Sequence, residues 1–61
     1  MNIITVKWVE ANPAKTGHDK EMRVVESNHG GYYKGARFDY GKCEMVAKEG
    51  YTVIILPMEA T

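Results

Sequence analysis

The chain lacks the features that stabilise small secreted domains and those that anchor membrane proteins. Its 61 residues include a single cysteine, Cys43, which cannot form an internal disulfide, and small secreted folds usually depend on several. The longest apolar run, Val53 to Met58, has six residues, whereas a membrane helix requires roughly 20. Lys7 interrupts the N-terminal apolar residues before a signal-peptide core can form. We therefore expect a cytoplasmic protein without membrane association.

An excess of charge of one sign is also missing. Eight Lys and Arg residues balance eight Asp and Glu residues, which argues against both a disordered chain and a strongly basic nucleic-acid binder. The length allows one domain, residues 1–61, and leaves little room for a large enzyme pocket with its own lid. Leucine occurs once, against six valines, four isoleucines, four threonines and four tyrosines. Side chains branched at Cβ suit a pleated surface, so this composition favours strands.

Alternation of apolar and polar residues predicts where those strands lie. In the first candidate, Ile4, Val6 and Trp8 share one face of a half-buried strand. The last candidate is apolar on both faces, which is typical of a strand covered on both sides. A long polar loop, residues 11–20, follows the first strand, and a Gly-rich turn precedes the third. The predicted strands are residues 3–10, 21–27, 32–38 and 51–56.

Residues 42–49 fit two patterns about equally. As a strand they alternate, and Glu49-Gly50 then forms a two-residue hairpin turn. As a helix they place Cys43 and Val46 on one face and end at Gly50. The strand is the favoured interpretation. The sequence thus predicts a mostly β fold of four to five antiparallel strands, as a small sheet or an SH3-like or OB-like barrel. The alternative is an α+β sheet covered by one short helix at about residues 42–49.

No residue pattern indicates catalysis or a cofactor. His18, Asp19, His29 and Cys43 could ligate a metal, but none of their spacings matches a known site, and both histidines lie in turns where solvated histidines are common. The glycines of residues 30–35 match no phosphate-binding loop and are better explained as turn residues. Cys43 alternates with Met45 and reads as a small buried residue with an unreactive thiol. We expect no enzyme activity, metal or cofactor.

The aromatic residues are the feature of the sequence that indicates a binding function. Residues 30–42 contain four aromatic side chains, three cations and one carboxylate, for a local charge of 3 − 1 = +2. One interpretation is a protein-binding module that acts as a homodimer and occupies a surface of another protein, with the loop 11–20 contributing to the contact. The alternative is a single-stranded nucleic-acid binder, disfavoured by the overall neutrality. The predicted binding residues are Trp8, Tyr32, Tyr33, Lys34, Arg37 and Tyr40; Phe38 and Lys42 are added for the nucleic-acid alternative.

The start of the chain carries one resemblance. The segment Ile3-Ile4-Thr5-Val6-Lys7, followed by a polar loop and by Met22-Arg23-Val24, resembles the opening of short accessory proteins of bacteriophages and mobile elements. The resemblance covers about the first 25 residues and its motif is of low specificity. It implies a bacterial cytoplasm and a protein that binds and modulates a host factor. No functional residue is carried over from it.

Overall fold

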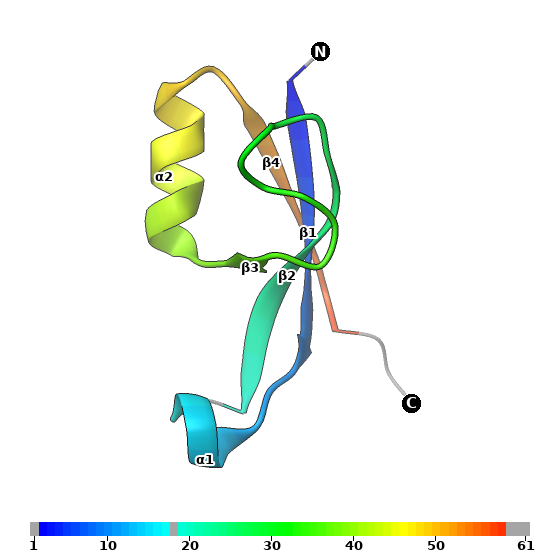
Figure 1. Cartoon of the computed structure of the whole chain (residues 1–61), viewed down its shortest axis with the longest axis vertical. Helices are drawn as coiled ribbons and strands as arrows, with labels where there is room; N and C mark the ends of the chain where they lie inside the picture. Colours follow the sequence, from blue (N-terminus) through cyan, green and yellow to red (C-terminus); the bar gives the residue numbers. More distant parts are fainter. Residues whose placement is uncertain (1, 18, 59–61) are drawn as a thin grey trace.

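The computed structural model describes residues 2–17 and 19–58 and contains one sheet and two helices (Figure 1). The strands are β1 (Ile3–Glu10), β2 (Lys20–Ser27), β3 (Arg37–Phe38) and β4 (Thr52–Leu56). A short helix, α1 (Pro13–Thr16), lies in the connection between β1 and β2, and a longer one, α2 (Tyr40–Lys48), connects β3 to β4. The mostly β prediction is confirmed in the form that includes one covering helix.

The sheet is mixed and open. Its strand order is β3-β2-β1-β4, with β1 antiparallel to β2, β2 antiparallel to β3, and β1 parallel to β4. β3 and β4 therefore run in the same direction at opposite edges, and parallel strands require a long crossover instead of a hairpin turn. α2 supplies that crossover. The predictions of an all-antiparallel sheet and of a closed barrel are wrong for this reason.

One face of the sheet forms the core. Ile4 and Val6 of β1 are fully buried, and they share this face with Met22 and Val24 of β2, as the alternation predicted. Val46 of α2 packs on them and is also fully buried. The buried set consists of Ile4, Val6, Met22, Val24, Phe38 and Val46, and Trp8, Tyr32, Ala36, Cys43, Tyr51 and Val53 pack around it.

α2 replaces the strand that was favoured for residues 42–49. Its N-cap is Asp39, whose backbone is extended and whose Oδ1 accepts a hydrogen bond from the Lys42 amide at 2.8 Å. Its end is a Schellman motif, in which Gly50 donates to the Ala47 carbonyl and Tyr51 to the Val46 carbonyl. Gly50 has φ +94°, so the glycine read as part of a hairpin turn instead terminates a helix.

The predicted strand 32–38 is mostly loop. Regular pairing covers only Arg37 and Phe38, opposite Arg23 and Met22. Gly35, at φ +91°, turns the chain so that its amide donates to the Val24 carbonyl, while the Val24 amide donates to the Ala36 carbonyl. The bend at this glycine interrupts the predicted strand, so regular pairing begins only at Arg37.

His29 anchors the same loop and is not a solvated turn residue. Its half-buried ring lies between Tyr32 and Tyr51, each 4.9 Å away between ring centroids. Nδ1 accepts a hydrogen bond from the Gly31 amide, so Nε2 carries the proton and donates it to Glu49 at 3.0 Å. The histidine therefore joins the loop to the end of α2.

β4 is an exposed edge strand. Ile54 and Ile55 are each 41% exposed and Leu56 is 37% exposed, so the expectation that both faces are covered is wrong. β4 has a paired neighbour on one side only, and the residues that pack against the core are Val53 and, just before the strand, Tyr51. The strand's bounds agree with the prediction to within one residue.

The helix end yields the first testable prediction. Gly50→Ala places a Cβ at positive φ, where L side chains are strained, and should lower the free energy of unfolding by about 1 kcal/mol. Gly30→Ala is the matched control, because Gly30 has no positive φ and an added Cβ there meets no atom within 4 Å. Urea denaturation of the three proteins measures the difference. Equal midpoints would contradict the Schellman assignment.

Candidate functional site

A half-open cavity of about 380 Å³ lies on the helix side of the sheet. The strands β1 and β2 extend past the start of α2 (Figure 1). The cavity is lined by residues from this end of the strands and from the start of the helix. Nine helical residues span about 14 Å, whereas the eight residues of β1 span about 26 Å. The helix is therefore too short to cover the whole face. The cavity is lined by Trp8, Asp19, Lys20, Glu21, Met22, Phe38, Asp39 and Tyr40.

Two aromatic side chains form adjoining walls of this cavity. Trp8 lies on the core face of β1 and is half-buried, while Tyr40 is the first residue of α2 and is 62% exposed. Their ring centroids are 6.1 Å apart and their planes meet at 61°, an edge-to-face arrangement. The buried side chains of Met22 and Phe38 complete the apolar lining. The rings of Trp8 and Tyr40 are thus attached to regular secondary structure instead of to a loop.

A cation already occupies one ring face. The Nζ of Lys20, at the start of β2, lies 5.0 Å from the centroid of the Trp8 ring. This distance is within the range of a cation–π interaction. The arrangement shows that the Trp8 ring is accessible to an ammonium group from the cavity side.

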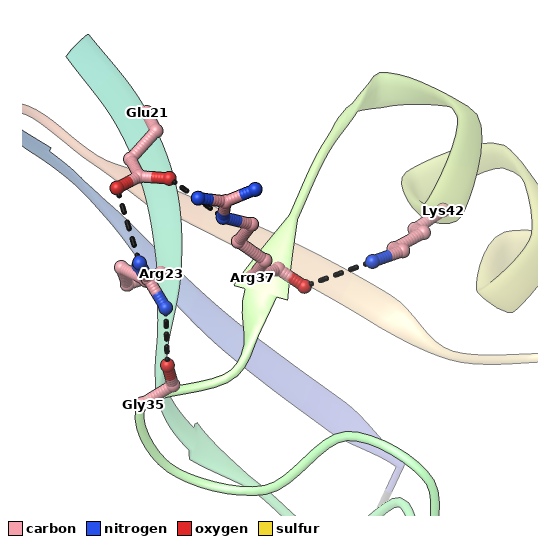
Figure 2. A network of polar contacts seen from close by, with 5 residues as sticks. All are labelled: Glu21, Arg23, Gly35, Arg37 and Lys42. Atoms are coloured by element: carbon pink, nitrogen blue, oxygen red, sulfur yellow. Dashed lines mark hydrogen bonds and ion pairs between the residues drawn. The ribbon is translucent and has the colours of Figure 1, made fainter. Parts of the chain in front are cut away.

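Glu21 forms an ion-pair network beside the cavity (Figure 2). Arg23 and Arg37 are direct partners across β2 and β3, and two like charges in that position repel each other. Glu21 offsets the repulsion, since Oε1 lies 3.1 Å from Arg23 and Oε2 lies 3.2 Å from Arg37. Arg23 also donates to the Gly35 carbonyl and Lys42 to the Arg37 carbonyl, so the network fixes the chain where it enters β3.

The predicted binding residues do not form one surface. Trp8 and Tyr40 meet at the cavity, but Tyr32 packs edge-to-face on Phe38 at 5.2 Å and belongs to the periphery of the core. Tyr33 is 71% exposed and does not line the cavity, and Lys34 is exposed beside it. Arg37 is exposed, with its guanidinium bound to Glu21.

Sequence reasoning missed much of the cavity lining. Lys20 was included only as part of the long loop, and Asp19 was considered only there and as a metal ligand. Glu21, Met22 and Asp39 were not considered as site residues. One signal was present, because pairing the two predicted N-terminal strands places Trp8 opposite Met22 and hence close to the start of β2. Tyr40 could not be placed from the sequence, since its position depends on α2.

Cys43 and His29 do not line this cavity. Cys43 packs against the core, and burial raises the pKa of its thiol, with a smaller contribution from the Asp39 carboxylate. Within residues 2–17 and 19–58, no three His, Cys, Asp or Glu side chains are grouped in a way that could hold a metal ion. His18 lies outside the described residues.

Comparison with known proteins gave no relative: no family model matches the chain, and neither a curated protein nor a solved structure is significantly similar to it. Neither helix in the described part of the chain has the length and hydrophobicity needed to cross a bilayer. The functional interpretation therefore rests on the cavity and its aromatic walls.

The state of Cys43 yields the second prediction. A raised pKa means less thiolate at any given pH, so iodoacetamide should modify folded protein at pH 8 more slowly than protein unfolded in guanidinium. The folded-state rate should keep rising with pH beyond the range in which an ordinary thiol is fully ionised. Rapid modification of the folded protein at neutral pH would contradict an inert thiol and make Cys43 a candidate nucleophile.

Proposed function

We propose that this chain is a small non-enzymatic binding module that contacts another protein through the cavity between Trp8 and Tyr40. The observation that carries the proposal is the exposed Tyr40 ring standing against Trp8 over a mostly apolar hollow. Aromatic side chains beside well-formed hollows are typical of residues that dominate binding energy in protein interfaces. Both are attached to regular elements, so little conformational entropy is lost when they bind.

Several observations favour a protein over a single-stranded nucleic acid. Base stacking requires exposed rings, but Phe38 is buried and Tyr32 is half-buried against it. Phosphate binding requires available cations, but the Arg37 guanidinium is held by Glu21 and the Lys42 ammonium donates to a backbone carbonyl. Among the residues of the nucleic-acid alternative, Tyr33, Lys34 and Arg37 are exposed, and Arg37 is paired with Glu21.

The resemblance of the N-terminal segment to phage and mobile-element accessory proteins suggests the setting. In that setting the partner is a bacterial host factor, and occupation of its surface modulates its activity. The neutral overall charge fits a contact dominated by aromatic and apolar groups.

The third prediction concerns this contact. Tyr40→Ser removes the exposed wall of the cavity and should weaken capture of a partner from bacterial lysate at least tenfold, because a central aromatic residue commonly contributes 2 kcal/mol or more, at about 1.4 kcal/mol per tenfold change. Tyr33→Ser is the matched control, since Tyr33 is equally exposed but lies outside the cavity, and it should bind like the wild type. Quantitative mass spectrometry of the captured proteins measures both.

Two results would contradict the proposal. One is capture that depends on Tyr33 and not on Tyr40, which would move the contact to the loop 28–36. The other is tight, salt-sensitive binding of labelled single-stranded oligonucleotides in fluorescence anisotropy, which would favour the nucleic-acid alternative.

We further propose that a second copy of the chain pairs with β4. This edge strand exposes Ile54, Ile55 and Leu56, and residues 51–58 carry no charged side chain, so antiparallel pairing of two copies sets no like charges against each other.

The fourth prediction tests this dimer. Ile54→Lys places a charge on the bare edge and should convert a dimer to a monomer in light scattering at the same protein concentration. Met45→Lys is the control, because Met45 is exposed on α2 and does not belong to the edge. A monomeric wild type at millimolar concentration would contradict the proposal.

A further inference from the structure

The cavity at Trp8 and Tyr40 has the chemistry of a receptor for a cation. Its aromatic walls offer negative π faces, and two of its rim residues, Asp19 and Asp39, are carboxylates. Glu21 adds a third carboxylate, but its charge is already offset by Arg23 and Arg37. Lys20 is the cation of the lining. Leaving Glu21 aside, the lining therefore carries two negative charges, from Asp19 and Asp39, and one positive charge, from Lys20.

Lys20 shows how a cation is held there. Its ammonium lies over the Trp8 ring, at the side of the cavity, and the residue itself is exposed at the end of β2. A long exposed side chain at a strand end changes rotamer readily, so Lys20 can withdraw into solvent. The Lys20 ammonium thus occupies the face of Trp8 at which a cationic ligand would bind, and such a ligand can displace it.

We infer that the cavity receives a basic side chain, foremost an arginine, from the protein partner; the inference rests on the proposed function and specifies its ligand. Arginine is favoured over lysine because a planar guanidinium stacks on an aromatic face while its N–H groups reach a neighbouring carboxylate. Trp8 supplies the stacking face and Asp39, next to Tyr40, supplies the acceptor. Asp39 Oδ1 caps α2, and a carboxylate can accept several hydrogen bonds at once.

The cavity is suited to this occupant in size as well as in charge. Its volume of about 380 Å³ is at the small end of the range for ligand pockets, which fits one side chain better than a folded segment. Met22 and Phe38, both buried, provide an apolar lining against which the methylene stem of an arginine packs. The charged end then lies at the rim, beside the carboxylates and in contact with water.

The fifth prediction tests the ligand with three blocked tripeptides, acetyl-Gly-X-Gly-amide, in which X is arginine, lysine or citrulline. Citrulline has the shape of arginine without its charge. Trp8 is the single tryptophan, so its fluorescence reports on the cavity, and amide shifts in two-dimensional NMR map the contact. We expect the arginine peptide to bind with a dissociation constant on the order of millimolar, more tightly than lysine, and citrulline to bind at least about threefold more weakly.

Two variants test how the charges of the cavity lining affect binding. Asp39→Asn keeps a good N-cap and removes one carboxylate, so it should weaken arginine binding about threefold while leaving the denaturation midpoint nearly unchanged. Lys20→Gln removes the internal competitor and should strengthen binding by a similar factor. Lys15→Gln, a change of equal charge on α1 away from the lining, is the control and should leave the affinity unchanged.

The outcomes distinguish this inference from the proposed function. Equal binding of the arginine and citrulline peptides, or weaker binding by Lys20→Gln, overturns the cationic ligand. A partner captured in a Tyr40-dependent manner would in that case still support the binding module, with a different group in the cavity. Amide shifts that map to the open face of the sheet instead of to Trp8 and Tyr40 also overturn the inference.

Discussion

The packing of one short helix on one face of the sheet is the constraint on which the rest of the structure depends. Val46 of α2 is fully buried against Ile4 and Val6, and the same helix carries the chain from one sheet edge to the other. A domain of this size hides only about 60% of its unfolded surface, so it has no second layer with which to cover the opposite face. The parallel pairing of β4, its bare edge and the hollow at the helix start all follow from that single crossover.

The hollow and the aromatic pair follow from a mismatch in length. The sheet is longer than the helix that covers it, so the apolar row of the sheet extends to Trp8, beyond the first residue of the helix. Tyr40 leans on Trp8 from the first position of α2, and Lys20 reaches over the indole from the neighbouring strand. These contacts shield an apolar surface only in part. An incompletely covered aromatic surface on rigid elements is the physical basis of the binding role proposed above.

Polar contacts fix the parts of the chain that have little regular structure. β3 has two paired residues, and Glu21 holds it by neutralising the two arginines that face each other across the strands. His29 fixes the loop before β3, through a hydrogen bond to Glu49 and ring contacts with two tyrosines. Both residues could be taken for functional groups in the sequence alone, yet the structure accounts for them as local anchors. Cys43 is comparable, since it is half-buried and packs against the core from α2.

The sequence by itself determined the strands whose side chains alternate, because a period of two is a local property of the chain. Residues 3–10 and, within one residue, 21–27 and 51–56 were predicted correctly, as was the core face through Ile4 and Val6. The tertiary structure decided the state of residues 42–49, where alternation and helical spacing fit about equally and burial of Val46 selects the helix. It also decided which aromatic residues meet. Trp8 and Tyr40 are 32 positions apart, and only the crossover of α2 over the sheet brings their rings together.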